Sequence, residues 1–189
     1  MRIGILGGTF NPVHIGHLLL AEEVFHSLYL DRVIFIPCFL PPHKDEHDVA
    51  PALDRLRMTQ LAVSDNPNFT VSDMEIKRKG KSYSIDTLKE LKKTLKPNTE
   101  LFFIVGSDAS SYLKKWRDVL ELFKLAKFVM AQRPGYRLKK IYKDIITLKI
   151  KAIDISGYEI RCRIKRKESV RYLVPEPVRQ YLEKKGLYR

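Results

Sequence analysis

The chain has 189 residues with 35 Lys or Arg, 22 Asp or Glu and a formal net charge of +13, and 44% of its residues are hydrophobic. A chain of this length can bury a sizeable core as one domain, and the sequence contains no internal repeat or low-complexity tract. It also has no run of the roughly 20 apolar residues that a membrane helix requires, and its apolar N-terminal run is too short for a signal peptide.

The positive charge is concentrated at the C-terminal end of the chain. Residues 133–189 hold 17 Lys or Arg against 6 Asp or Glu, whereas residues 1–132 hold 18 against 16. A basic end of this kind fits nucleic acid, a site for highly phosphorylated small molecules, or a solvated surface. Solvated helix faces explain most of these lysines.

The two cysteines, Cys38 and Cys162, stand alone, without the CxxC or Cys/His spacing of a zinc site. The sequence therefore predicts neither a disulfide framework nor a metal held by the protein itself. A reduced, cytoplasmic setting fits this cysteine usage best.

Strand and helix patterns alternate along the chain. Apolar runs predict strands at residues 2–6, 32–37, 69–76, 101–105 and 126–131. Helical periodicity predicts helices at residues 18–28, 53–64, 84–95 and 118–125, and we expect a small helical C-terminal segment at about 156–189. This alternation predicts an α/β fold in a single domain, a Rossmann-like, doubly wound, mainly parallel sheet with helices on both faces.

Candidate chemistry follows three of the predicted strands. Ligands of doubly wound sheets bind beyond the carboxyl ends of the strands, where the strand order reverses. The segments found there are GGTFNPVHIGH (7–17), PPHK (41–44) and GSD (106–108). We therefore expect all three segments at one edge of the sheet.

The first of these segments combines glycines with two histidines. Gly7 and Gly8 allow a sharp turn and a close approach of backbone to a phosphate, and Gly16 does the same at the start of the next helix. His14 and His17 share one face of that helix start, with no carboxylate cluster beside them. One interpretation is a phosphate-binding loop, because two such imidazoles can donate hydrogen bonds to phosphate oxygens. The simpler interpretation is a glycine turn with surface histidines.

Taken with the other motifs, this loop resembles that of the bacterial nicotinate-nucleotide adenylyltransferases, a family of the HxGH nucleotidylyltransferase superfamily. The resemblance extends over nearly the whole chain. It includes GGTFNPVHIGH, PPHK, SYSIDTL (82–88), GSD with the later Trp116, QRPG (132–135), ISGYEIR (155–161) and YLVPEPVRQYL (172–182).

The sequence departs from the family pattern in three places. Asn11 stands where Asp is usual, and Ser84 stands where Thr is usual. Gly157 and Tyr158 replace a Ser and a Thr, which removes one hydroxyl expected at the nucleotide phosphates. Tyr158 then either still faces the phosphates or has taken a packing or stacking role.

The resemblance implies an enzyme of NAD biosynthesis that transfers AMP from ATP to nicotinate mononucleotide, giving nicotinate adenine dinucleotide and pyrophosphate. The attacking group is already an anionic phosphate, so the reaction requires alignment of two polyanions and neutralisation of charge rather than a general base. Mg²⁺ is expected with ATP, held mainly by phosphates and waters. The expected partners are ATP and nicotinate mononucleotide, without nucleic acid or membrane, and a homo-oligomer is left open.

The resemblance assigns the candidate residues to three groups. The catalytic group neutralises phosphate charge, with His17 nearest the α-phosphate, and comprises His14, His17, Lys44 and Arg161. The ATP-binding group comprises Gly7, Gly8, Thr9, Phe10, Gly16, Gly106, Asp108, Arg133 and Ser156. The group that binds nicotinate mononucleotide comprises His43, Tyr83, Ser84, Tyr112 and Trp116.

Some of these residues have a second interpretation. Asp108 follows a strand and suits a ribose hydroxyl, but Asp is equally favoured as a helix N-cap. Trp116 holds the position on which the pyridine ring stacks in the family, although most lone tryptophans are core residues. His43 is either a ligand of the substrate or a loop residue.

Other functions remain open at this point. Another HxGH transferase, such as a pantetheine-phosphate adenylyltransferase or a glycerol-phosphate cytidylyltransferase, would lack SYSIDTL and the context of Trp116. A tRNA synthetase fragment would need a KMSKS-like lysine loop, which ISGYEIR is not. A basic nucleic-acid-binding protein would draw on KRK (165–167) but would leave the glycine loop unexplained.

The start of the helix predicted at 84–95 gives a test of substrate choice. We expect Ser82 or Ser84 as its N-cap and its first backbone N–H groups as donors. A nicotinate carboxylate accepts from all such donors, whereas an amide cannot. We expect Tyr83 and Ser84 to form this edge, Trp116 to hold the ring and Tyr112 to close the far side.

Overall fold

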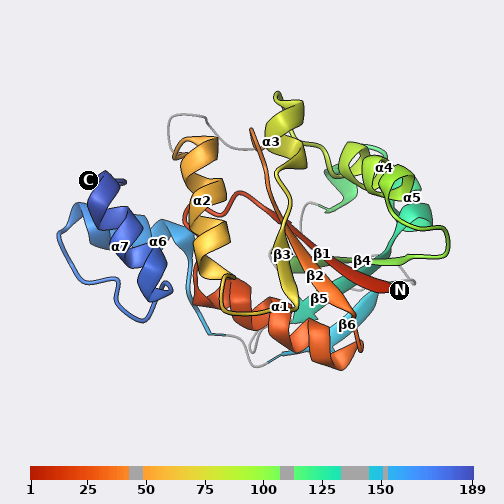
Figure 1. The fold of residues 1–189 in the computed structure, drawn as a ribbon, viewed down its shortest axis with the longest axis horizontal. Coiled ribbons are helices and arrows are strands. Elements are labelled where there is room, and N and C mark those ends of the chain that lie inside the picture. Colours follow the sequence, from red (N-terminus) through yellow and green to blue (C-terminus); the bar gives the residue numbers. More distant parts are fainter. Residues whose placement is uncertain (43–48, 107–112, 133–144, 151–152) are drawn as a thin grey trace.

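The computed structural model describes residues 1–42, 49–106, 113–132, 145–150 and 153–189. Within these residues, six strands form one parallel sheet in the order β3-β2-β1-β4-β5-β6 (Figure 1). The strands are β1 (Arg2–Gly8), β2 (Arg32–Pro37), β3 (Phe69–Val71), β4 (Glu100–Gly106), β5 (Lys127–Gln132) and β6 (Ile146–Lys149). The helices are α1 (Ile15–Ser27), α2 (Ala52–Ala62), α3 (Met74–Arg78), α4 (Ser84–Thr94), the 3-10 turn η3 (Leu113–Lys115), α5 (Val119–Leu125), α6 (Gly157–Lys165) and α7 (Glu176–Lys185).

The strand order places a switch point at β1. The chain runs outward from β1 through β2 to β3, and then crosses to β4 on the other side of β1. Ile5 accordingly pairs with Ile34 of β2 and with Phe103 of β4. At such a point the carboxyl ends of neighbouring strands border a crevice. The α/β, Rossmann-like, doubly wound fold expected from the sequence is confirmed.

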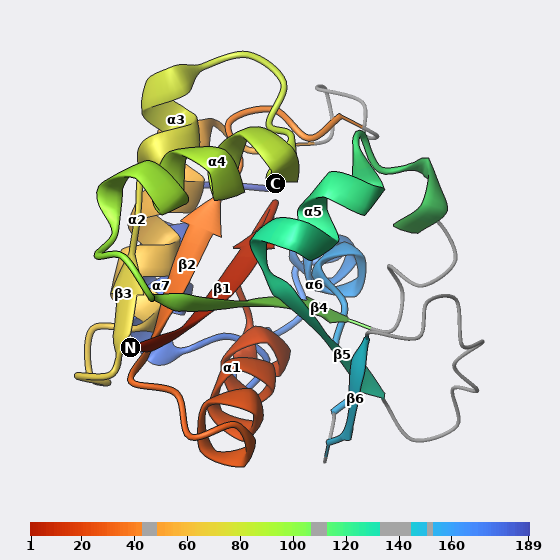
Figure 2. The same cartoon turned by 90° about the vertical axis from the view of Figure 1, so that its right-hand side faces the viewer.

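Helices cover both faces of the sheet, and the side chains of each strand alternate between two hydrophobic clusters. Leu6 and Phe35 belong to the cluster that also holds Val24 of α1 and residues of α2. Their neighbours in sequence, such as Ile5 and Ile34, belong to the cluster that holds residues of α4 and α5. Figure 2 shows α4 and α5 on one side of the sheet and α1 on the other. This alternation is why the strands are almost continuously apolar.

The C-terminal helices close the core beside α2. Helix α7 packs against α2, with α6 next to it (Figure 1). Ile160 and Leu182 from these helices share the cluster that contains Leu6 of β1. The Tyr181 hydroxyl also donates a hydrogen bond to Asp54 Oδ1 of α2 at 2.7 Å. Within the described ranges, no helix is both long and apolar enough to cross a membrane.

Two elements differ from the sequence analysis. The strand predicted at 69–76 ends at Val71, because Met74–Arg78 forms α3 and buries the side chains of Glu75 and Ile76. Residues 74–78 are all helix formers, and the backbone then turns at Lys79 and Gly80, whose φ angles are 60° and 69°. Strand β6 was not predicted, because its four residues alternate in exposure over too short a length to stand out from a loop.

Candidate active site

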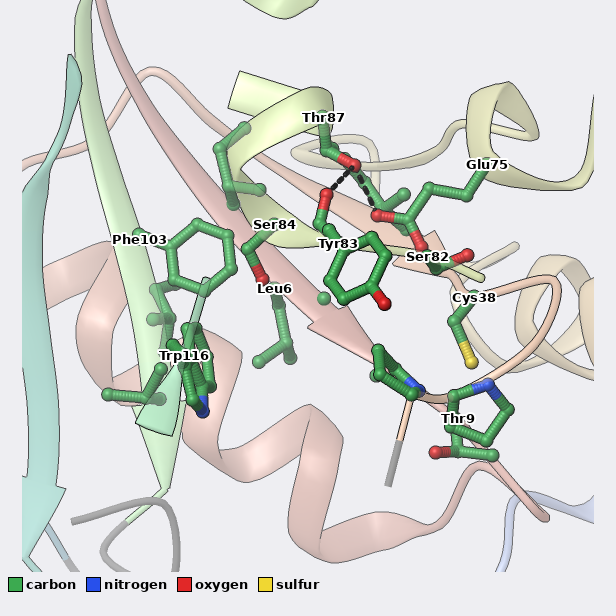
Figure 3. Close-up of a pocket in the computed structure, with 18 of the residues that line it drawn as sticks. Leu6, Thr9, Cys38, Glu75, Ser82, Tyr83, Ser84, Thr87, Phe103 and Trp116 are labelled. Atoms are coloured by element: carbon green, nitrogen blue, oxygen red, sulfur yellow. Dashed lines mark hydrogen bonds between the residues drawn. The ribbon is translucent and has the colours of Figure 1, made fainter. Parts of the chain in front are cut away.

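A cavity of about 720 Å³ opens at the carboxyl ends of β1, β2 and β4 (Figure 3). Residues that end or directly follow these strands line its floor, among them Gly8, Thr9, Cys38 and Gly106. The walls come from α1, from the α3–α4 region and from the segment before α5. In Figure 3, Trp116 and Phe103 lie on one side of the cavity and Tyr83, Glu75 and Cys38 on the other. The cavity therefore lies at the edge of the sheet that the sequence indicated.

The two histidines form a stacked pair at the start of α1. His14 is the N-cap residue, and its backbone N–H donates a hydrogen bond to His17 Nδ1 at 3.2 Å. The ring centroids of the two histidines are 3.7 Å apart, and the Phe10 and His17 rings form a T-shaped pair with centroids 5.1 Å apart. Because His17 Nδ1 accepts this hydrogen bond, the neutral ring carries its proton on Nε2. His17 lines the cavity, whereas His14 is buried behind it.

Gly16 gives the His14 ring the space to stack on His17. A Cβ atom at Gly16 would lie 3.1 Å from His14 Nδ1, closer than ordinary van der Waals contact. Any larger residue between the histidines would therefore push the His14 ring away from its partner. The glycine of the HIGH sequence thus acts through the geometry of the histidine pair.

The start of α6 abuts the loop that carries these histidines. Ser156 is the N-cap of α6, and its Oγ accepts a hydrogen bond from the Glu159 N–H at 3.1 Å. Arg161 Nη1 donates to the backbone carbonyl of Asn11 at 2.9 Å. Tyr158 is 71% exposed, and the Arg161 guanidinium lies 5.7 Å from the centroid of its ring. Ser156 and Arg161 are therefore held beside the histidine loop but do not line the cavity.

Aromatic side chains line both sides of the cavity beyond the histidines. Trp116 and Phe103 form a T-shaped pair with ring centroids 5.9 Å apart. The guanidinium of Arg117 lies 5.0 Å from the centroid of the Tyr83 ring and 3.8 Å from the carboxylate of Asp86. These contacts leave Tyr83, Trp116 and Arg117 lining a single compartment.

The N-cap expected for α4 is wrong in one respect. Tyr83, rather than Ser82 or Ser84, is the N-cap residue, and it makes no side-chain cap hydrogen bond. Ser82 Oγ instead accepts from the Phe39 N–H at 3.0 Å, which ties it to the loop after β2. Ser84 lines the cavity as the first residue of the helix. The helix start therefore faces the cavity without a side-chain cap.

A buried carboxylate supports this helix start from below. Thr87 Oγ1 donates to Glu75 Oε1 at 2.5 Å, and Arg78 Nη2 donates to Thr87 Oγ1 at 2.9 Å. Burial raises the pKa of the Glu75 carboxyl above its usual value, while hydrogen bonds from Thr87 and Ser82 oppose the shift. Glu75 thereby joins α3 to the first turns of α4.

Comparison with known proteins agrees with these features. The pattern of the "Cytidylyltransferase-like" family matches residues 5–163. A protein of Desulfitobacterium hafniense (strain Y51), named "Probable nicotinate-nucleotide adenylyltransferase", is 47% identical over 199 residues, which cover 100% of this chain and 96% of that protein. A Thermus thermophilus protein of the same name is 47% identical over 189 residues, which cover 100% of each. The chain belongs to the nicotinate-nucleotide adenylyltransferase family.

This membership confirms the resemblance seen in the sequence and does not favour the pantetheine-phosphate or nucleic-acid alternatives. A solved structure of the Plasmodium falciparum nicotinic acid mononucleotide adenylyltransferase, described as complexed with NaAD, has a TM-score of 0.84 at 19% sequence identity. The alignment covers 99% of this chain and 97% of that chain. At this identity the likeness shows that the two chains share a fold.

The cavity brings together about half of the residues that the sequence singled out for this adenylyltransferase. The residues that line it are Gly7, Gly8, Thr9, His17, Tyr83, Ser84, Gly106 and Trp116. Phe10, His14 and Gly16 lie directly behind His17, and the Phe10 ring is buried in the core. Five further candidates, His43, Lys44, Asp108, Tyr112 and Arg133, lie outside the described residues.

Sequence reasoning missed three charged residues at this adenylyltransferase site, Arg55, Glu75 and Arg117. Arg55 is fully buried behind the loops that follow β1 and β2. Its only signal in the sequence is that it shares one helix face with Met58, Thr59 and Ala62, at spacings of three, four and seven. The apolar residues of α2 alone would predict the wrong buried face, because the side chain of Leu53 is exposed.

Proposed function

We propose that this chain transfers the adenylyl group of ATP to nicotinate mononucleotide, which yields nicotinate adenine dinucleotide and releases pyrophosphate. Family membership supports the reaction class. The observation that carries the proposal is a single cavity with two chemically different ends. The glycine loop and His17 suit phosphates at one end, and Trp116 with the uncapped start of α4 suits an aromatic acid at the other.

The reaction needs positive charge and alignment more than proton transfer. A phosphate oxygen of nicotinate mononucleotide forms a bond to the α-phosphorus of ATP, and the bond from that phosphorus to the oxygen bridging to the β-phosphate breaks. Pyrophosphate leaves with the bridging oxygen. Because the attacking oxygen is already anionic, the protein has only to align the two phosphates and stabilise the charge that develops.

His17 is the group that we place nearest the α-phosphate. Its Nδ1 accepts from the His14 N–H, so the neutral ring would donate to a phosphate oxygen through Nε2–H. His14 holds the ring in place through stacking and through its backbone N–H. Lys44, Arg133 and Arg161 would supply further positive charge, and Asp108 would accept from a ribose hydroxyl.

Mg²⁺ belongs to this proposal as the partner of ATP. Within the described residues, no group of three or more His, Cys, Asp or Glu side chains is arranged to hold a metal ion. The lining groups near the glycine loop are backbone, hydroxyl and imidazole. The phosphates of ATP and water molecules fit as the ligands of the ion, which would neutralise phosphate charge. We place the enzyme in the cytoplasm, where ATP is supplied and cysteines stay reduced.

A pyrophosphate-release assay tests the proposal. The purified chain is supplied with Mg²⁺ and one acceptor at a time: nicotinate mononucleotide, nicotinamide mononucleotide or pantetheine phosphate with ATP, or glycerol phosphate with CTP. We expect turnover with nicotinate mononucleotide and loss of turnover when EDTA removes Mg²⁺. Release of pyrophosphate only with pantetheine phosphate or glycerol phosphate would overturn the proposal. Light scattering on the same sample measures the oligomeric state.

A further inference from the structure

Helix α2 carries a buried arginine that the proposed chemistry does not use. Arg55 is 1% exposed, and its guanidinium donates hydrogen bonds to four backbone carbonyl oxygens. The acceptors are Thr9, Cys38 and Phe39, each at 2.7 Å, and Ala50 at 2.8 Å. Thr9 follows β1 and Cys38 follows β2, and both line the cavity. One side chain therefore links the two loops that form the cavity floor.

In the part of the chain that the structure describes, carbonyl dipoles rather than a carboxylate balance the charge of Arg55. Asp54, the neighbouring acid of α2, accepts a hydrogen bond from the Tyr181 hydroxyl instead. Burial raises the pKa of the Cys38 thiol and of the Tyr188 phenol, so these two groups near Arg55 are neutral. A buried cation balanced by dipoles alone is costly to fold and attracts an anion.

We propose that Arg55 is a positioning residue for the ATP phosphates and that its buried charge supplies part of the positive potential that binds them. The inference rests on the proposed function. A carbonyl oxygen that pointed into the cavity would repel a phosphate, but those of Thr9 and Cys38 point at the guanidinium, which is buried behind the cavity floor. Because charges are weakly screened in the protein interior, the charge of Arg55 attracts a polyanion bound beside Thr9.

Three variants separate charge from geometry. Arg55→Met removes the charge while keeping a long apolar side chain. Arg55→Lys keeps the charge but loses the planar fork that reaches four carbonyls. Arg57→Met is the matched control, because Arg57 lies on the same helix and is exposed to solvent. Calorimetry would measure the binding of ATP, tripolyphosphate and adenosine to each folded variant.

The expected pattern depends on phosphate. Arg55→Met should weaken the binding of ATP and tripolyphosphate by about tenfold or more and that of adenosine by less than about twofold. Arg57→Met should change all three by less than about twofold, because water and salt screen an exposed charge. Arg55→Lys should keep tripolyphosphate affinity within about threefold while kcat falls at least about tenfold, since the floor loops lose their fixed positions.

Two results would overturn the inference. Equal losses for adenosine and tripolyphosphate in Arg55→Met would reduce Arg55 to a structural role. If Arg55→Met does not fold, Arg55→Lys decides, and a loss of tripolyphosphate affinity of about tenfold or more in that variant, with adenosine affinity within about twofold of the wild type, refutes the role of the charge. Neither result alters pyrophosphate release by the wild-type chain, so this inference and the proposed function fail separately.

Discussion

His14 and His17 work as one unit, because each fixes the other. The backbone N–H of His14 occupies Nδ1 of His17, and the two rings stack at 3.7 Å between centroids. Phe10 closes the remaining side of His17 with its buried ring. The imidazole is thus oriented before any ligand arrives, and a preorganised donor costs little reorganisation in the transition state.

We predict that His17→Ala loses most turnover while ATP still binds. A donor used chiefly in the transition state affects kcat more than KM, and the loss of one such donor typically costs on the order of 10²–10³ in rate. Steady-state kinetics measures kcat and KM, and calorimetry measures the affinity for ATP. His26→Ala is the control, because His26 is exposed and its Nε2 pairs with Glu22 on the same helix. Near wild-type kcat in His17→Ala would contradict the assignment.

Gly157, which stands where the family usually has serine, has a steric explanation. The neighbouring departure, Tyr158, is an exposed side chain. A Cβ atom at Gly157 would lie 2.9 Å from the backbone oxygen of Asn11, so the start of α6 fits against this loop only with glycine. We predict that Gly157→Ser lowers the stability by about 1–3 kcal/mol through this overpacking. Tyr158→Thr should change it by less than about 1 kcal/mol, because the ring is exposed and its contact with the Arg161 guanidinium lies at the surface.

Thermal melts of the two single variants and the double variant, with and without ATP, measure these effects. Restoring the serine and threonine that are usual in the family is therefore expected to destabilise this chain, through Gly157 rather than Tyr158. A double variant that is as stable as the wild type and binds ATP more tightly would show that both positions still face the phosphates.

Among the elements, α4 has the clearest part in substrate choice. Its N-cap residue Tyr83 makes no side-chain cap hydrogen bond, and the helix start opens into the cavity beside Trp116. The first backbone N–H groups of a helix are donors only, and the helix dipole adds partial positive charge. Arg117, which lines the same cavity, adds a guanidinium whose charge Asp86 and Asp118 partly balance from 3.8 Å each.

We predict a preference for nicotinate over nicotinamide mononucleotide of at least about 10²-fold in kcat/KM. An amide would turn its NH₂ group toward a donor and leave buried groups unpaired, at roughly 1–3 kcal/mol each. Competition kinetics with the two mononucleotides gives the ratio. Trp116→Phe is the control variant, because a smaller ring should slow both substrates and leave the ratio unchanged. Equal rates with the two mononucleotides in the wild type would show that this helix end does not read the substrate.

Elements with strong periodicity could be predicted from the sequence, and those without it could not. The apolar strand LFFIV and the helix with Leu88 and Leu91 on one face were predicted within a residue or two. Strand β6 was missed because its pattern is four residues long. The face that α2 buries was hidden because a buried arginine holds a position that an apolar residue usually fills.

For the molecule as a whole, the position of the site could be predicted from the strand topology. The buried residues that hold the site in place could not. Parallel strands bring the segments after β1, β2 and β4 to one edge, so residues such as Gly8 and Gly106 could be placed together from sequence. Arg55, Glu75 and Asn11 act through hydrogen bonds to residues that are far away in sequence, and no local pattern encodes such pairs. The hydrogen bond between Tyr188 and Asn11, which joins the two ends of the chain, is one such pair.

The C-terminal end reaches back to the histidine loop at Asn11. The Tyr188 hydroxyl donates to Asn11 Oδ1 at 2.6 Å, and the Ala50 N–H donates to the same oxygen at 3.0 Å. Arg161 meanwhile donates to the Asn11 carbonyl at 2.9 Å. Asn11 therefore joins three distant parts of the chain next to the residues that we assign to ATP.

We predict that Tyr188→Phe lowers the free energy of unfolding by about 0.5–1.5 kcal/mol, the usual net value of one hydrogen bond. It should also lower kcat/KM for ATP, because the loop that holds His14 and His17 loses one of its anchors. Denaturant unfolding and steady-state kinetics measure the two effects. Tyr172→Phe is the control, since the Tyr172 side chain is 84% exposed and should change neither. If Tyr188→Phe loses stability with unchanged kcat/KM, the C-terminal end supports the fold without positioning the histidine loop.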